Sequence, residues 1–345
     1  MSPKAVRGAM GRNVRSDDMD SFDRPGKRTR PRTKDRPDYS ELPIGRIITI
    51  DRGRYRVQLD EHMLTATKAR QLGRKGVIVG DLVRLDGDTT GDEGTLARIV
   101  ATEERTTVLR RTADDNDPFE RPIVANADQL MIVTALADPP PRMGMIDRIM
   151  VAAYDAGVSP VLCLTKADLA SPDELIAAYA PLDVPIVVTA PDSDLTEVRE
   201  VLQDRVTVFV GHSGVGKSTL VNALIPGVNR TTGVVNDVTG RGRHTSTSAI
   251  ALELPPDEDG NETGWVIDTP GVRSFGLSHV TPDSVLAAFG DLSRFTEECP
   301  RGCQHGVDDP ECGLDAAVAR GDLSTVRVDS YRRMWRAGRL KDWEI

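Results

Sequence analysis

Hydrophobic and polar residues follow two different periodicities along this chain, and the change between them divides it. Residues 43–111 hold short apolar runs, and Tyr55, Val57 and Leu59 alternate with polar neighbours. Such period-two alternation is typical of a strand with one buried face. Five short strands in this region suit a small barrel such as an OB-fold. We expect these strands over 44–50, 54–59, 77–79, 82–85 and 96–100.

From Ile123 onward, apolar strands alternate with segments of helical periodicity. Ile146, Ile149 and Ala153 recur at helical spacing, which predicts a helix over 145–156. A capping-box sequence with proline in the first turn, at 171–174, predicts the start of another. This alternation predicts a doubly wound parallel α/β sheet. Strands are expected over 129–134, 161–164, 186–188, 206–210, 249–254 and 265–267, with a helix over 217–224.

The two ends of the chain differ from this α/β region. Thr281-Pro282-Asp283 predicts the start of a helix toward residue 289, and further helices are expected over 314–319 and 328–340. Residues 1–39 are rich in Arg, Asp, Ser and Pro, which predicts a disordered tail that either contacts RNA or is only solvated. The predicted divisions are a tail (1–40), a barrel (41–112), an α/β domain (113–280) and a helical module (281–345).

The charge is unevenly distributed. The formal net charge is -9, yet residues 1–40 hold 11 Lys/Arg against 6 Asp. The net negative charge argues against a general polyanion-binding protein, and any RNA contact must come from local basic patches. In the barrel the candidates are Arg52, Arg54, Arg56, Arg70, Arg74 and Lys75; the alternative is a barrel without a ligand. On the last helix they are Arg332, Arg333, Arg336, Arg339 and Lys341; the alternative is a solvated helix face.

No apolar run approaches the roughly 18–20 residues of a membrane span. The N-terminal segment also lacks the apolar centre of a signal peptide. We therefore expect a cytoplasmic protein that does not enter the membrane. A monomer is also expected.

A glycine-rich motif of the Gly-x4-Gly-Lys-Ser form follows the strand expected over 206–210. Its backbone N–H groups would surround the α- and β-phosphates of a nucleotide, and the following helix N-terminus favours negative charge. Lys217 would reach the β- and γ-phosphates as a catalytic cation, and Ser218 would bind Mg²⁺. The predicted phosphate-binding residues are Gly211, His212, Ser213, Gly214, Val215, Gly216, Lys217, Ser218 and Thr219.

Two further motifs identify the base and the metal side of this site, and they occur in an unusual order. In the sequence Thr165-Lys166-Ala-Asp168, Asp168 would accept hydrogen bonds from guanine N1 and N2, which adenine cannot offer. This base-reading motif precedes the phosphate loop, whereas Asp268-Thr-Pro-Gly271 follows it. Asp268 would hold Mg²⁺ through water, and the Gly271 N–H would meet the γ-phosphate. The order predicts a circularly permuted GTPase. The base-side residues are Thr165, Lys166, Asp168 and Ala190, the last through its backbone N–H to guanine O6.

Residues 226–248 lack apolar periodicity and lie where a GTPase switch segment belongs. Thr245 is the favoured additional Mg²⁺ ligand, with Thr247 as the alternative. Val272 stands where many GTPases carry a water-orienting Gln, so slow unaided hydrolysis is expected. His244 is the candidate catalytic group, although a solvated or RNA-facing histidine is the open alternative.

A cluster of sulfur and nitrogen ligands follows the GTPase motifs. Three thiols and one imidazole occur within 14 residues, at Cys299, Cys303, His305 and Cys312. This set matches a closed tetrahedral Zn²⁺ site. The alternative is a group of free thiols. Cys163 lies within an apolar strand and is interpreted as a core residue.

Together these residues resemble the ribosome-small-subunit-dependent GTPase A family, also called RsgA or YjeQ. The resemblance covers about residues 43–345 and rests on the motif order, the Gly-Arg-His-Thr switch and the cysteine spacing. It implies an OB-like barrel, a permuted GTPase domain and a zinc-binding helical module. It also implies that the residues named above bind GTP and zinc. The chain departs from the family in the three-residue spacing of its first two cysteines, in Thr165 in place of Asn, and in its long Arg-rich tail.

The resemblance implies a late-assembly factor that binds the small ribosomal subunit and its 16S rRNA and hydrolyses GTP there. One alternative is a GTP-dependent RNA-binding switch with negligible turnover, which Val272 would allow. A second is a GTPase that serves another RNA or a membrane-bound partner, although no amphipathic or lipidation signal supports the membrane version.

Overall fold

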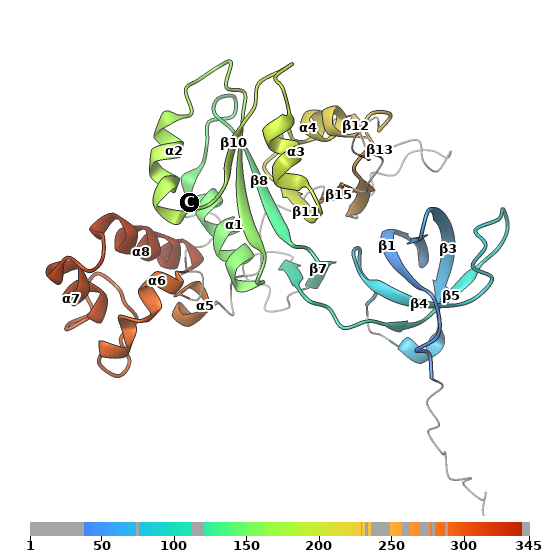
Figure 1. Ribbon diagram of the computed structural model, residues 1–345, viewed down its shortest axis with the longest axis horizontal. Coiled ribbons are helices and arrows are strands. Elements are labelled where there is room, and N and C mark those ends of the chain that lie inside the picture. Colours follow the sequence, from blue (N-terminus) through green and yellow to red (C-terminus); the bar gives the residue numbers. More distant parts are fainter. Residues whose placement is uncertain are drawn as a thin grey trace, which may run out of the picture. The chain divides into compact units, whose positions relative to one another are not determined.

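The computed structural model describes residues 38–73, 76–111, 121–228, 230–231, 234–235, 249–256, 263–269, 277, 280–286 and 289–339 (Figure 1). Among these residues, no helix combines the length and the apolar character that crossing a bilayer requires. The tail predicted over 1–40 lies almost entirely outside the described residues, as do Arg74 and Lys75.

The N-terminal part of the described chain is a closed five-stranded barrel, as the sequence predicts. Its strands follow the order β1-β2-β3-β5-β4 around the barrel, and β3 and β5 close it in parallel. Alternate residues of each strand point inward, so that Val57, Leu85 and Ile99 are fully buried. The elements are β1 (Ile44–Asp51), β2 (Arg54–Leu59), β3 (His62–Lys68), η1 (Arg70–Leu72, a 3₁₀ helix), β4 (Leu82–Gly87) and β5 (Ala97–Thr102).

One of the five expected barrel strands was wrong. The segment 77–79 forms only an isolated bridge, between Val79 and Val124, and β3 takes the place expected for it. Val77 packs into the barrel core and Val79 into the neighbouring α/β core, so both valines are buried without belonging to a ladder. The strand β3 escaped detection because its buried residues include only one large aliphatic side chain, Leu64.

A two-stranded hairpin, β6 (Val108–Arg111) and β7 (Arg121–Ala125), connects the barrel to the α/β region and was not expected. It spans residue 112, where we placed a domain boundary. The Asn126 side chain beyond it accepts the Thr106 N–H at 2.9 Å and donates to the Gly80 carbonyl at 3.0 Å. A Cβ on Gly80 would lie 2.1 Å from the Ala125 carbonyl oxygen, so only glycine allows this close approach.

The α/β region is a six-stranded sheet of order β10-β9-β8-β11-β15-β14. Every pairing is parallel except that of β14 with β15, which adds an antiparallel edge strand to the expected parallel sheet. Most expected elements are confirmed, whereas α3 was not expected. The strands are β8 (Gln129–Ala135), β9 (Ser159–Thr165), β10 (Ile186–Val188), β11 (Arg205–Val210), β14 (Ile250–Glu253) and β15 (Gly264–Asp268); β12 (Arg230–Thr231) and β13 (Val234–Val235) pair separately. The helices are α1 (Met143–Asp155), α2 (Asp173–Tyr179), η2 (Ala180–Leu182), α3 (Thr196–Leu202) and α4 (Lys217–Leu224).

Helices cover both faces of this sheet (Figure 1). Successive residues of β8 alternate between two cores: Ile132 faces the helices α1 and α2, and Val133 faces α3 and α4. The sheet is therefore doubly wound, as expected. The capping box expected before α2 is not formed: Pro172 is the N-cap, and Ser171 Oγ accepts the Asp173 N–H at 3.2 Å.

The C-terminal helices share the core on the α1 face of the sheet. Phe289 lies between two aromatic rings in edge contacts, with centroid distances of 6.2 Å to Tyr154 of α1 and 5.5 Å to Tyr331. Apolar burial therefore joins this module to the GTPase half that holds α1. Its elements are α5 (Pro282–Leu286), α6 (Gly290–Ser293), η3 (Thr296–Glu298), α7 (Gly313–Arg320) and α8 (Thr325–Arg339).

A buried carboxylate lies in the contact between α1 and α8. Asp147 is 3% exposed, accepts the Tyr179 hydroxyl at 2.8 Å and pairs with Arg333 at 3.1 Å. The Arg333 guanidinium also covers the Tyr179 ring at 4.9 Å. Burial raises the pKa of Asp147, and Arg333 opposes that rise. The helix α8 thus supplies the cation that a buried carboxylate requires.

This contact predicts the effect of one substitution. Arg333→Ala leaves Asp147 buried beside Tyr179 alone, which should lower the free energy of unfolding by about 1–3 kcal/mol. Arg336→Ala, an exposed position on the same helix, should change it by less than about 0.5 kcal/mol. Urea denaturation followed by circular dichroism measures both. Equal stabilities of the two variants would contradict the structural role of Arg333.

Candidate nucleotide and metal sites

The predicted base-reading and phosphate-binding loops open from the same edge of the sheet. The strand β8 lies between β9 and β11 and is parallel to both. Its register pairs Ala135 with Thr165 on one side and Ile132 with Val210 on the other. Because the carboxyl ends of parallel strands meet at one edge, both loops begin there and flank a single strand.

The phosphate loop has the backbone that the glycine spacing predicts. Gly214 and Gly216 have φ values of 84° and 90°, a region that favours glycine. A Cβ on Gly211 would lie 2.4 Å from the Val133 carbonyl oxygen. The helix α4 begins at Lys217, so Ser218 and Thr219 stand in its first turn. The loop and the helix N-terminus together can hold an anion.

Thr165 joins these two loops directly. Its hydroxyl donates to the Val215 carbonyl oxygen at 2.5 Å and lies 3.3 Å from that of Thr134. A Cβ on Gly216 would lie 3.6 Å from the same hydroxyl oxygen, so Thr165 packs closely against the phosphate loop. Threonine therefore makes a connection between loops at a position where asparagine is usual.

Lys217 and Asp268 meet beside the phosphate loop. Asp268 ends β15 opposite Phe209, and its side chain is 3% exposed. The Lys217 ammonium donates to the Asp268 carboxylate. The neighbouring Thr269 hydroxyl donates to the Phe209 carbonyl at 3.0 Å, which fixes the end of β15. The structure thus brings together a cation for phosphate and a carboxylate for a metal ion.

The second base-side loop follows β10. The Thr189 N–H donates to the Leu164 carbonyl at 2.8 Å, and the Thr189 carbonyl accepts the Ala167 N–H at 3.1 Å. Ala190 therefore lies next to the loop that carries the exposed Asp168. The Ala190 N–H donates to the Ser193 hydroxyl at 3.2 Å. We did not expect Ser193 at this site, although a short polar turn over 189–193 was visible in the sequence.

Several predicted site residues lie outside the described residues: His244, Thr245, Thr247, Gly271 and Val272. Their roles in catalysis and Mg²⁺ binding stay predictions.

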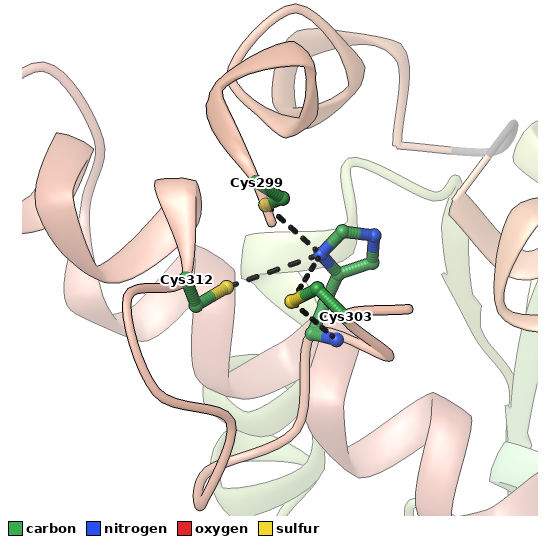
Figure 2. A group of neighbouring side chains, drawn as sticks. Cys299, Cys303 and Cys312 are labelled. Carbon is green, nitrogen blue, oxygen red and sulfur yellow. Dashed lines mark hydrogen bonds between the residues drawn. The ribbon is translucent and has the colours of Figure 1, made fainter. Parts of the chain in front are cut away.

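The predicted metal ligands converge in the C-terminal module. The ligand atoms of Cys299, Cys303, His305 and Cys312 all lie within 4.8 Å of one another. Figure 2 shows the three sulfur atoms turned toward one imidazole nitrogen; the distances to His305 Nδ1 are 3.4, 3.5 and 3.9 Å. One ion with bonds of about 2.0–2.3 Å would fit between such ligands.

Backbone groups support this cluster. The Gly313 N–H donates to Cys299 Sγ at 3.1 Å, and the His305 N–H donates to Cys303 Sγ at 3.4 Å. Burial raises the pKa of Cys303 to about 12 and lowers that of His305. Metal binding must therefore displace thiol protons, and the backbone donors favour the resulting thiolates.

The helix α8 also contacts the loop that carries His305. Arg332 is buried; it donates to the His305 carbonyl at 3.0 Å and forms a bidentate pair with Asp315 at 2.8 and 2.9 Å. The expectation that Arg332 and Arg333 contact phosphate is therefore wrong, because both guanidinium groups are committed within the fold. Arg336 is exposed, and Lys341 lies outside the described residues.

The remaining predicted residues are one core cysteine and the arginines of the barrel. Cys163 is fully buried, which confirms it as a core residue, and this burial raises the pKa of its thiol to about 12. In the barrel, Arg52, Arg54 and Arg70 are exposed and Arg56 is half-buried. Arg54 and Arg56 stand two residues apart on β2 and so lie on one face of the sheet.

The chain is similar in sequence to proteins of a known family. The family model described as RsgA GTPase matches residues 102–278. The chain belongs to this family. The Small ribosomal subunit biogenesis GTPase RsgA 1 of Vibrio vulnificus is 37% identical over 271 residues, which cover 76% of this chain and 74% of that protein. The RsgA protein of Chlorobaculum tepidum is 36% identical over 277 residues, covering 77% and 86%.

Solved structures agree with the family assignment. The crystal structure of YjeQ from Thermotoga maritima has a TM-score of 0.60 at 25% identity and covers 87% of this chain and 99% of its own. YloQ, described as a circularly permuted GTPase, has a TM-score of 0.61 at 24% identity, covers 87% and 96%, and supports the fold. The strand order and motif order of this RsgA GTPase therefore reflect a circular permutation.

The ligand cluster predicts a measurable metal content. Cys303→Ala should lose about one bound metal ion per chain and lower the melting temperature of the C-terminal module, because metal binding contributes folding free energy. Cys163→Ala, which removes a core thiol of β9, should keep the metal. Inductively coupled plasma mass spectrometry of the purified proteins measures both. A metal-free wild-type protein would contradict the assignment.

Proposed function

We propose that this protein binds GTP at the β8–β11 sheet edge, hydrolyses it to GDP and phosphate, and does so while bound to the small ribosomal subunit. The observation that carries the proposal is the hydrogen bond from Thr165 to Val215, which joins a guanine-reading loop to a phosphate loop. Membership of the RsgA GTPase family supports the reaction. The names of the relatives, which refer to biogenesis of the small ribosomal subunit, support the partner.

Guanine recognition in this proposal rests on three groups. The exposed Asp168 carboxylate accepts hydrogen bonds from guanine N1 and N2. Lys166 lies along the base plane. The Ala190 N–H donates to guanine O6 in exchange for the Ser193 hydroxyl that it meets in this structure. Adenine offers neither the donors for Asp168 nor the acceptor for Ala190, so the site selects GTP.

Phosphate binding rests on the loop 211–216 and α4. Backbone N–H groups of the loop surround the phosphates, and Lys217 exchanges its contact with Asp268 for the β- and γ-phosphate oxygens. Ser218 and Asp268 would hold Mg²⁺, assisted by Thr245 or Thr247, and the ion would supply charge neutralisation. His244 is proposed to orient the attacking water, and Gly271 to contact the γ-phosphate.

The C-terminal cluster is proposed to bind one structural Zn²⁺. Three thiolates and one imidazole form a closed tetrahedral set with no position left for substrate, which is typical of structural zinc. Soft thiolate ligands also disfavour Mg²⁺ and Ca²⁺. Both Arg332 and the backbone donors hold the loop in place around the ion.

The proposed partner surface includes the exposed arginines of the barrel, which would contact 16S rRNA phosphates. Arg52, Arg54 and Arg70 supply exposed positive charge on a chain of net charge -9, so binding would depend on such local positive charge. Nucleotide-dependent ordering of the switch segment would dock and release the protein. We propose that the protein acts as a monomer in the cytoplasm.

The base-site assignment predicts a change of nucleotide preference. Asp168→Asn should bind GTP about 10- to 100-fold more weakly, because it loses a charge-assisted pair of hydrogen bonds. The same variant should gain affinity for xanthosine triphosphate, whose C2 carbonyl oxygen can accept a hydrogen bond from the new side-chain amide at position 168. Competition against a fluorescent guanine nucleotide measures both. Asp173→Asn, an exposed position on α2, is the control. Unchanged selectivity would remove Asp168 from the base site.

The partner assignment predicts stimulated turnover. Purified small ribosomal subunits should raise the rate of phosphate release on the order of a hundredfold, because a partner completes the catalytic site. Large subunits should not. Slow turnover under all conditions, with GTP-dependent RNA binding, would instead support a switch with negligible catalysis. Turnover indifferent to ribosomes, without RNA binding, would exclude this partner.

A further inference from the structure

A short segment after β8 lies between the two nucleotide loops, and no motif predicted it. The Lys166 ammonium donates to the Asp138 carbonyl oxygen. The adjoining Pro139 ring lies beside the phosphate loop, since a Cβ on Gly214 would lie 3.7 Å from Pro139 Cδ. The segment 138–139 therefore contacts the base-reading lysine and lies beside the phosphate loop.

We infer that Asp138 is a positioning residue for guanine nucleotides, which holds Lys166 in its base-binding orientation through the backbone carbonyl. The inference rests on the proposed GTP site and adds a residue to it. A lysine side chain has four rotatable bonds and loses much freedom when it lies along a ligand. A carbonyl that holds the ammonium beforehand reduces that entropic cost of binding.

The backbone of Asp138 explains how its carbonyl reaches Lys166. Asp138 has a φ of 47° although it is not glycine. Aspartate and asparagine tolerate this left-handed region, whereas β-branched residues are strongly disfavoured there. The Asp138 side chain is exposed. The sequence requirement at this position is therefore for the backbone conformation rather than for the carboxylate.

The neighbouring contacts fix the segment at both ends. The Leu136 N–H donates to the Thr165 carbonyl at 2.9 Å, which ties the chain just before Asp138 to the start of the base-reading loop. The helix α1 begins at Met143, a few residues beyond it. Prolines at 139, 140 and 141 stiffen the stretch between these anchors. The carbonyl is thus presented by a constrained loop.

The experiment compares two pairs of substitutions by fluorescent-GDP titration and steady-state GTP hydrolysis with small subunits. Asp138→Val, which disfavours positive φ, should weaken GDP binding about three- to tenfold, from the rotamer freedom that Lys166 regains. KM should rise while kcat stays unchanged. Asp138→Asn should rescue wild-type binding. Asp183→Val is the matched control, since Asp183 is exposed with a φ of 56° after η2, where the chain enters β10. Asp138→Ala should show the same effect more weakly and serves if the valine variant does not fold.

A double-mutant cycle isolates the contact itself. In a Lys166→Ala background, Asp138→Val should cause no further loss of GDP affinity. The same loss in both backgrounds would overturn the inference and place the effect in the position of Pro139 beside Gly214. Wild-type affinity of Asp138→Val would overturn it as well. A wild-type protein that binds no guanine nucleotide would refute the proposed function, which is a separate outcome.

Discussion

The parallel pairing of β9, β8 and β11 is the constraint on which the nucleotide site depends. It places two loops that are separated by about 45 residues of chain at one edge, on either side of a single strand. The Thr165 hydroxyl then joins them by donating to Val215. Glycine at 216 is required by its φ of 90°, and the Thr165 side chain packs beside it. The hydrogen bond and the glycine conformation are thus two parts of one arrangement.

Circular permutation leaves this arrangement intact because the pairing of neighbouring strands does not depend on the order in which the chain connects them. The register of β8 with its neighbours is what the site requires, and more than one order of connection can join the same parallel strands while helices cover both faces. What permutation changes is the element that follows β15. The strand ends in Asp268 at the phosphate side of the site. The helices further along the chain return to the α1 face and share its core through Phe289.

The arginines of α8 show how that shared core is held. Adjacent residues on the helix have different partners: Arg332 binds the cysteine-histidine loop through the His305 carbonyl and Asp315, and Arg333 pairs with Asp147 of α1. One helix therefore connects the cysteine-histidine cluster to the GTPase half. From sequence alone these residues read as a basic face for phosphate. Burial accounts for Arg332, because a buried guanidinium must satisfy its donors within the fold, whereas the half-buried Arg333 is held by its pair with the buried Asp147.

The sequence was sufficient where a pattern has one physical cause. The glycine spacing at 211–216, the thiol and imidazole spacing at 299–312 and the period-two alternation around Tyr55 each specify local geometry, and the structure reproduces it. The sequence was insufficient where a residue is buried without belonging to a strand, or where a strand pairs although few of its residues are aliphatic. Val77 and Val79 are buried in two different cores without forming a strand, and β3 pairs fully with little aliphatic content.

Contacts made through the backbone were the least predictable part of the site. Asp138 acts by its carbonyl and Ser193 by accepting an N–H, so neither needs a motif of conspicuous side chains. Charge shows the same limit from the other direction. The chain is acidic overall, and the structure commits two of the arginines that seemed available for RNA. Among the described residues, the exposed positive charge that remains for a polyanion includes Arg52, Arg54 and Arg70 of the barrel. Attraction of a polyanion to this acidic chain would therefore rest on exposed arginines such as these, and screening by salt should weaken it more than it weakens nucleotide binding.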